Sequence, residues 1–198
     1  AAKCHCMGDY EGITKKYIEF SSQEGEFDRE NCEDFSVKHI LAGMEEQELG
    51  LVKDIFQVPE VSSMEGSDSV LLLTQQFVNM GFLTVRQEKE LYDLMLDYFA
   101  PESMLYVKPH PSDWQGLYGD WYPDAVTLPR FMPSELLPYT SNGKFKTGIT
   151  VSSTSIFGLE PYMENIICLD SSLEDHYENI NWYYAVGQIL DQGIREAE

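Results

Sequence analysis

Apolar and polar residues follow one another along this chain in blocks that fit a strand and then a helix. Residues 69–75 (SVLLLTQ) contain a continuous apolar run, which is typical of a strand buried on both faces. Residues 84–99 place apolar side chains at helical spacing, with Thr84 and Gln87 positioned for a capping box and Pro101 just beyond the end. This stretch therefore predicts one strand followed by one capped helix.

The same alternation continues through the rest of the chain. The expected strands lie at 51–57, 104–108, 125–128, 147–152 and 165–169, and the expected helical segments at 134–139, 154–161 and 172–196. Strands and helices that alternate with short loops predict an α/β fold with a Rossmann-like, doubly wound parallel sheet.

Residues 1–50 do not share this pattern. We expect one helix there, over 36–49, with Gly50 just past its end as a stop signal. The sequence therefore predicts a partial N-terminal segment or linker at 1–50 and a sheet domain at 51–198.

The net charge of the chain excludes one class of binding partner. The chain has 198 residues, 43% of them apolar, which is enough to fill a core. The formal net charge of −21 would repel a nucleic-acid backbone, so we expect no nucleic-acid partner. An anionic ligand would need a local pocket rich in cations or N–H groups.

The cysteines and the lengths of the apolar runs indicate the cellular compartment in which we expect the protein. The four cysteines, Cys4, Cys6, Cys32 and Cys168, are few for a disulfide scaffold, so a reducing compartment is expected. The segment around Cys4 and Cys6 lacks a second ligand pair at zinc spacing, so we expect no metal. No run is long enough to span a membrane and no signal-peptide core is visible, so we expect a cytoplasmic protein, with attachment to the surface of an inner membrane left open.

Polar clusters follow three of the predicted apolar runs, where ligands bind in parallel sheets. In the first, prolines flank His110 and stiffen the backbone that holds it, next to Lys108. An imidazole held there can donate to a phosphate oxygen or act as a general acid. The alternative is a rigid turn in which His110 packs on Trp114 or Tyr118.

The other clusters carry hydroxyl and carboxyl groups. Ser152, Ser153, Thr154 and Ser155 stand where a strand passes into a helix and could bind a phosphate, although N-capping needs only one of them. Glu135 could accept hydrogen bonds from ribose hydroxyls, or it could simply complement a helix dipole.

A fourth candidate lies near the start of the chain. Glu11, between Tyr10 and Gly12, could serve as a general base for an acceptor hydroxyl. An ordinary acidic turn is the alternative.

These clusters, in this order, resemble those of the bacterial sialyltransferases of the GT-B kind, particularly glycosyltransferase family 52, the lipooligosaccharide sialyltransferases, and its polysialyltransferase relatives. The resemblance covers roughly residues 65–170. It rests on His110-Pro111 within YVKPHP, on Ser152-Ser153 within TVSSTSIFGLEPY, and on LLLTQQF at 71–77. In the third family motif, an acidic pair before glycine, only Glu11-Gly12 is in register, because Tyr10 stands where an acid is expected.

The resemblance implies a role for each residue. His110 would contact the CMP phosphate and protonate it as it leaves. Ser152, Ser153 and Thr154 would bind the same phosphate. Glu135 would hold the ribose. The remaining roles fall to Lys108 and Pro111, which would shape the pocket, and to Glu11, which would be the base.

The implied reaction is an inverting transfer of sialic acid from CMP-sialic acid to a hydroxyl of a glycan or lipooligosaccharide, with no cofactor or required metal. The chain would be the C-terminal, donor-binding half of such an enzyme. Two other functions stay open: a related GT-B transferase that uses another nucleotide sugar, or a non-catalytic module that binds a nucleotide or a glycan. A hydrolase is disfavoured, because the serine cluster lacks a nucleophile-elbow pattern.

Overall fold

The computed structural model describes residues 14–19, 31–59, 69–101, 103–113, 117–140 and 144–169. By its internal contacts the chain divides into two compact units, Ala1–Gly50 and Leu51–Glu198. The donor-binding role assigned to the second unit stays a prediction.

The first unit contains a small parallel strand pair. β1 (Lys16–Ile18) pairs with β2 (Cys32–Asp34), with Lys16 opposite Cys32 in the register. Helix α1 (Val37–Ala42) follows, and the Ser36 side chain caps it by accepting from the amide of His39. Hydroxyl capping of this kind satisfies an amide that has no partner within the helix.

The sequence prediction for residues 36–57 was wrong in two respects. The single helix expected over 36–49 is two helices, α1 and α2 (Glu46–Phe56), because the Gly43 amide closes α1 and the Glu48 carboxylate accepts from the amide of Glu45. Gly50 lies inside α2 rather than past a helix end.

The strand expected over 51–57 is also part of α2. The less exposed apolar residues there, Leu49, Val52 and Phe56, are spaced by three and four positions. That spacing belongs to one side of a helix and not to a strand. The short apolar run was ambiguous, and the helical period decided its structure.

The second unit is built on a five-stranded sheet in which every neighbouring pair is parallel. Its strand order is β5-β4-β3-β6-β7. The strands are β3 (Ser69–Leu73), β4 (Met104–Lys108), β5 (Val126–Thr127), β6 (Phe145–Thr150) and β7 (Met163–Cys168). All five were predicted, with ends shifted by a few residues. The unit therefore has an α/β fold with a parallel sheet flanked by helices.

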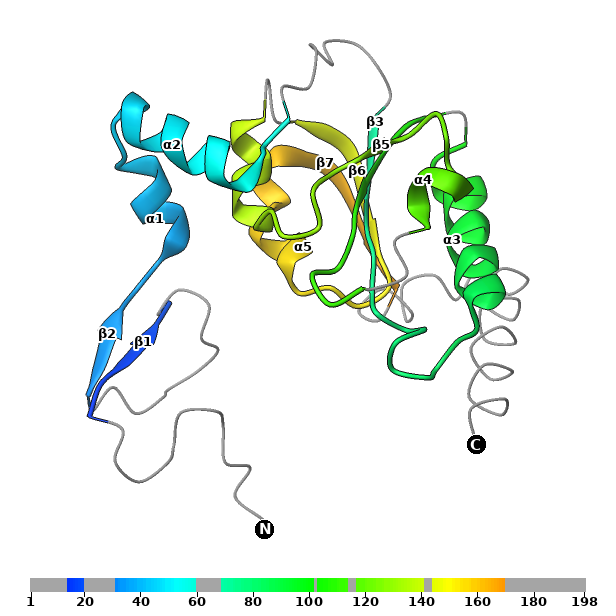
Figure 1. Cartoon of the computed structure of the whole chain (residues 1–198), viewed down its shortest axis with the longest axis horizontal. Coiled ribbons are helices and arrows are strands. Elements are labelled where there is room, and N and C mark those ends of the chain that lie inside the picture. The colour runs from blue at the N-terminus through cyan, green and yellow to red at the C-terminus, as the bar shows by residue number, and fades with distance from the viewer. Residues whose placement is uncertain are drawn as a thin grey trace. The chain divides into compact units, whose positions relative to one another are not determined.

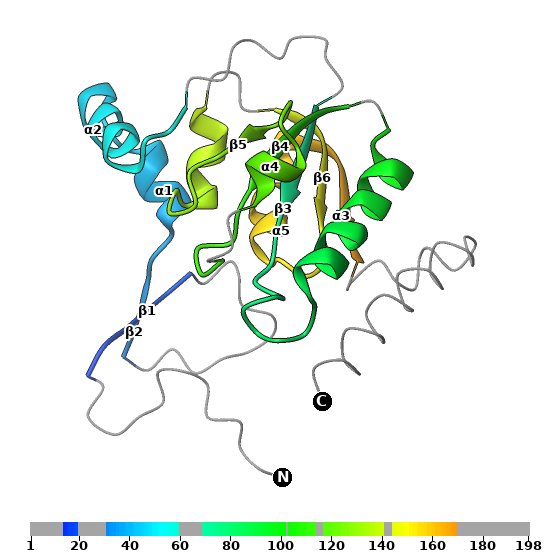
Figure 2. The same ribbon diagram turned by 45° about the vertical axis from the view of Figure 1, so that its right-hand side comes forward.

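Strand β3 occupies the centre of the sheet, and all five of its residues are buried. On one face, Val70 and Leu72 join a core cluster with Leu91 and Met95 of helix α3 (Val85–Phe99). Figures 1 and 2 show α3 and the short helix α5 (Ser155–Gly158) on opposite sides of the sheet. A strand covered on both faces needs an unbroken apolar run, and the sequence of β3 supplies one.

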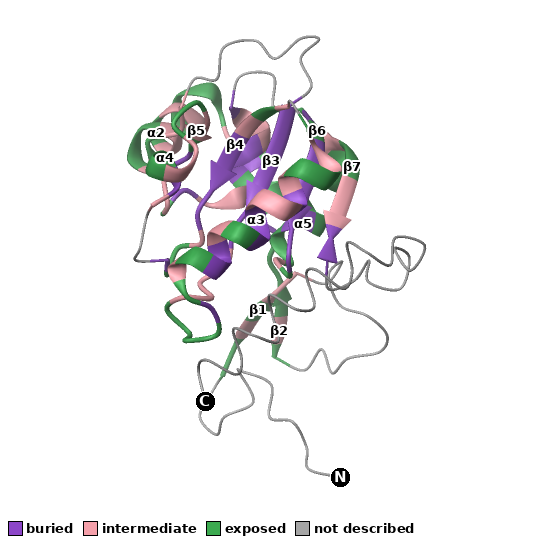
Figure 3. Ribbon diagram, turned by 90° about the vertical axis from the view of Figure 1, so that its right-hand side faces the viewer, coloured by how far each residue is buried: buried purple, intermediate pink, exposed green. Residues whose placement is uncertain are grey.

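Helix α3 begins with the predicted capping box. The amide of Gln87 donates to Thr84 Oγ1, and the amide of Thr84 donates to Gln87 Oε1 at 2.8 Å. Figure 3 shows the helix lying across the sheet with exposed residues on its outer side. The prediction for 84–99 is confirmed, because capping and periodicity agree here.

On the opposite face of the sheet, the side chains of Ile156 and Met163 pack closely against Gly148 in β6. A β-carbon at this position would lie 3.2 Å from Ile156 Cδ1 and would overlap the sulfur of Met163. Glycine therefore lets α5 approach the sheet.

Helix α5 itself is shorter than predicted. The helix expected over 154–161 is two pieces, α5 and the 3₁₀-helix η3 (Glu160–Tyr162). Pro161 disfavours α-helical geometry at the residue before it and removes one donor, which breaks the helix.

The second unit contains two further short helices. They are α4 (Tyr118–Trp121) and the 3₁₀-helix η2 (Ser134–Tyr139), the second of which fits the predicted helical turn. The helix expected over 172–196 lies outside the described residues. Among the helices that the structure describes, none is long and apolar enough to cross a membrane.

Candidate functional site

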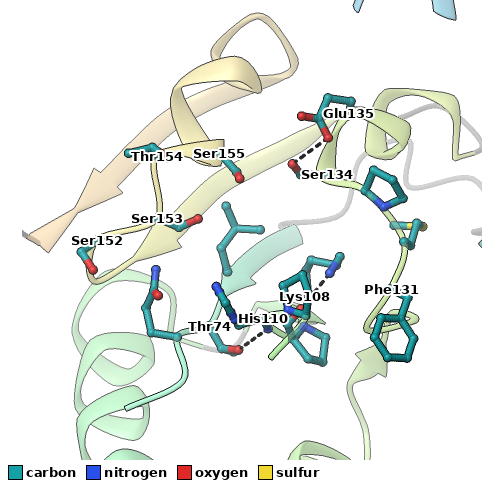
Figure 4. A pocket seen from close by; sticks show the side chains of 16 residues that line it. Thr74, Lys108, His110, Phe131, Ser134, Glu135, Ser152, Ser153, Thr154 and Ser155 are labelled. Atoms are coloured by element: carbon teal, nitrogen blue, oxygen red, sulfur yellow. Dashed lines mark hydrogen bonds between the residues drawn. The ribbon is translucent and has the colours of Figure 1, made fainter. Parts of the chain in front are cut away.

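A pocket of about 570 Å³ opens at the carboxyl ends of β3, β4 and β6. Its walls come from Leu73 and from residues 74–75, 108–111, 131–135 and 152–155. Figure 4 shows the serine-rich loop on one wall and Glu135 on another, with His110 and Lys108 between them. Side chains from three separate loops therefore face a common space.

This pocket brings together nearly all the residues that the sequence analysis selected. Those that line it are Lys108, His110, Pro111, Glu135, Ser152, Ser153 and Thr154. Glu11 lies outside the described residues, so its role stays a prediction. Their roles in binding are likewise predictions.

Sequence reasoning missed Thr74, Gln75 and Phe131, which also line the pocket. Thr74 and Gln75 directly follow the apolar run of β3, so the rule used for the other clusters could have found them. No local signal marks Phe131, an exposed aromatic residue at the pocket, because only the chain path between β5 and η2 places it there.

His110 is fixed by two hydrogen bonds. Its backbone amide donates to Thr74 Oγ1 at 3.1 Å, and the amide of Ser112 donates to its Nδ1 at 3.1 Å. Because Nδ1 accepts, the neutral imidazole carries its proton on Nε2. Burial and the charge of Lys108 both lower the pKa of His110, while Asp113 opposes them. A mainly neutral ring with an Nε2–H donor is therefore expected at pH 7.

Lys108 is a buried cation, 5% exposed, at the end of β4. Its Nζ donates to the carbonyl oxygens of Pro109 at 2.7 Å and of Arg130 at 2.9 Å. Burial lowers the pKa of Lys108 to about 8, partly offset by the carboxylate of Glu135. The side chain thus ties β4 to the segment before η2 and stays charged at pH 7.

The serine-rich loop is anchored from below by Thr150. The buried Thr150 hydroxyl donates to the carbonyl oxygen of Leu73 at 2.9 Å and accepts from the amide of Ser153 at 3.1 Å. The Ser153 amide is therefore occupied, and α5, with four residues, adds little dipole, so the helix start contributes little to binding a phosphate at this loop.

The hydroxyl groups of the serine-rich loop are the other possible donors to a ligand. Thr154, at the N-cap position of α5, makes no capping bond through its side chain. Within the described residues, the hydroxyls of Ser152, Ser153 and Ser155 have no partner among the protein's own groups. Capping therefore does not account for this run of hydroxyls, which leaves them able to bind a ligand.

Glu135 stands in the first turn of η2 with its side chain exposed at the pocket. Ser134 Oγ donates to its Oε2 at 3.2 Å. Its negative charge partly offsets the lowering of the Lys108 pKa by burial. A carboxylate here can accept from two neighbouring hydroxyls of a ligand.

The pocket has hydroxyl donors on one wall and a carboxylate on another, with an imidazole N–H and a buried cation between them. The donors and the cation suit a phosphate, and the carboxylate suits a sugar with free hydroxyls. No group of three or more His, Cys, Asp or Glu side chains within the described ranges could hold a metal ion.

Comparisons with protein family models, with curated proteins and with solved structures gave no match for this chain.

Proposed function

We propose that the pocket binds the nucleotide of a CMP-sugar and that the chain is the donor-binding half of a sialyltransferase-like glycosyltransferase. One observation carries this proposal: His110, the hydroxyls of 152–154 and Glu135 converge on one pocket from three different loops. A nucleoside monophosphate needs such a division, with donors for the phosphate and an acceptor for the ribose.

The sheet supports the same proposal. If its five strands are numbered along the chain, their order is 3-2-1-4-5, which is the order within a Rossmann-type sheet. Ligands of such sheets bind at the carboxyl ends of the strands where the order reverses, between β3 and β6 in this protein. The pocket lies there, as expected for the C-terminal domain of a GT-B enzyme.

The chemistry would be the transfer of sialic acid with inversion from CMP to a glycan hydroxyl. As the bond to CMP breaks, negative charge grows on the phosphate and the sugar becomes oxocarbenium-like. The Nε2–H of His110, the loop hydroxyls and the Lys108 charge would stabilise that phosphate. Glu11 would take the proton of the acceptor hydroxyl, a role that rests on the family resemblance alone.

Calorimetric titration with CMP tests the proposal, with UMP, GDP and ADP as competing ligands. We expect CMP to bind best and His110→Ala to weaken it by about ten-fold, the value of one hydrogen bond to a charged group. The matched control is His39→Ala, because His39 is an exposed histidine on α1 that does not line the pocket.

Two outcomes would contradict the proposal. A preference for UMP, GDP or ADP would overturn the choice of CMP while leaving a nucleotide site. Absence of binding for all four nucleotides would remove the nucleotide site itself.

A further inference from the structure

Four buried side chains next to the pocket have no part in the proposed reaction. Glu88 and Tyr92 belong to α3, Asp113 follows β4, and Tyr118 begins α4. Each is at most 2% exposed. Acidic side chains are costly to bury, so their retention needs a structural or functional reason.

Asp113 is bonded through its backbone and its side chain. Its amide donates to the carbonyl oxygen of His110 at 3.0 Å, and its own carbonyl accepts from Arg130 Nη1 at 2.7 Å. Its carboxylate accepts from the hydroxyl of Tyr118 at 2.6 Å. The turn that carries His110 therefore ends on a residue that three groups hold in place.

Neighbouring contacts hold the rest of this turn. The side-chain amide of Asn79 donates to the carbonyl of Ser112, whose own amide donates to His110 Nδ1. The hydroxyl of Tyr92 accepts from the amide of Gln75 at 2.8 Å, which fixes the loop after β3. The two loops that meet at His110 are thus both tied to the buried cluster.

The two acidic side chains of this cluster, Glu88 and Asp113, act on each other. Burial, and then the charge of Asp113, raise the pKa of Glu88 to about 8, so Glu88 is mainly protonated at pH 7. Burial also raises the pKa of Tyr118, which remains a hydroxyl donor. The charged groups that act on His110 are Lys108, which lowers its pKa, and Asp113, which raises it.

We propose that Asp113, held by Tyr118, is the positioning residue for His110: it fixes the turn that presents the imidazole to the pocket and places a negative charge beside the ring. This proposal rests on the proposed function in one respect, the choice of CMP as the ligand in the binding measurements. The placement of His110 is a property of the free protein and can be measured without a nucleotide.

The first test is Asp113→Asn, which keeps an acceptor for Tyr118 but removes the charge. NMR titration of the His110 ring, identified by its loss in His110→Gln, should show the ring titrating at lower pH than in the wild type. Because the acceptor for Tyr118 and the backbone bonds of the turn remain in this variant, CMP affinity should stay close to that of the wild type.

The chain offers a matched control. Tyr122, directly after α4, donates through its hydroxyl to Oδ1 of Asp93 on α3 at 2.9 Å, and this second tyrosine–aspartate pair does not line the pocket. Asp93→Asn should leave both the His110 titration and the CMP affinity unchanged.

An unchanged His110 titration in folded Asp113→Asn would overturn the proposal. Tyr118→Phe, which removes the donor to the Asp113 carboxylate, tests the positioning separately and decides alone if Asp113→Asn does not fold. It should speed hydrogen exchange at the Asp113 amide and weaken CMP binding, and no change in either overturns the proposal. If the wild type binds no nucleotide, the proposed function fails, while the titration and the exchange rates still test the role of Asp113.

Discussion

The amide of Ser112 donates to Nδ1 of His110 across 3.1 Å, which decides where the imidazole carries its proton. With Nδ1 engaged, only Nε2 can donate to a ligand. The Ser112 amide, two positions after His110, thus leaves the imidazole with one N–H, on Nε2, for a ligand in the pocket.

Removing the loop hydroxyls should affect binding and not stability. The double variant Ser152→Ala/Ser153→Ala is expected to weaken CMP binding by about ten-fold, because the phosphate loses two neutral donors. Its melting temperature should stay near that of the wild type, since neither hydroxyl has a partner within the described residues.

Thr150→Val is the contrasting variant. It removes a buried hydroxyl that serves both Leu73 and Ser153, so the free energy of unfolding should fall by about 1–3 kcal/mol. Denaturant unfolding measures this loss. Equal stability of Thr150→Val and the wild type would mean that the hydroxyl does not anchor the loop.

Glu135 should distinguish ribose from deoxyribose. If its carboxylate accepts from the ribose hydroxyls, the wild type should bind CMP more tightly than 2′-deoxy-CMP, by about ten-fold for one lost charged hydrogen bond. Glu135→Gln should reduce that preference. Glu160→Gln, which changes an exposed glutamate at the start of η3, should keep it.

Glu88 should make the protein less stable as the pH rises. Its pKa is about 8 in the folded chain and near 4.5 in the unfolded chain, so the folded state binds more protons between these values. The free energy of unfolding should fall across that range by at most about 1.4 kcal/mol per pH unit from this group.

Comparing Glu88→Gln with the wild type in denaturant at pH 5, 7 and 8.5 isolates this effect. The variant should gain stability relative to the wild type as pH increases. A constant difference between the two proteins would show that Glu88 is ionised at pH 7, and the acidic cluster would then need another account.

Lys108 should make binding of an anion depend on pH in the alkaline range. Its pKa is about 8 in the free protein, so its charge is lost as pH rises through that value. CMP affinity should decline between pH 7 and 9.5, and Lys108→Met should bind weakly throughout without this decline. His110→Gln serves as the control, because it should bind weakly yet keep the dependence on pH.

Lys108 should change the free energy of unfolding with pH in the opposite direction to Glu88. The pKa of this lysine is lower in the folded chain, so the unfolded chain binds more protons between about 8 and 10.5. Its contribution to the free energy of unfolding therefore increases with pH over that range, which separates it from the effect of Glu88.

The sequence by itself determined the elements with strong local signals. The four-residue apolar run of β3 (70–73) favours a buried strand, and the capping box of Thr84 and Gln87 fixed the start of α3. The rule that ligands bind after parallel strands also selected His110 and the serine run, which the fold brings to one pocket.

A local signal was also overlooked, because Pro161 divides the helix predicted over 154–161 into two short pieces. The tertiary structure decided what local patterns left open, such as the run at 51–57, which fitted a strand or a helix. The partners of Lys108, Asp113 and Thr150 lie up to 77 positions away, as Leu73 does from Thr150. Such pairings depend on which strands become neighbours, and the order of a parallel sheet is set by packing between distant segments, which local patterns along the chain do not encode.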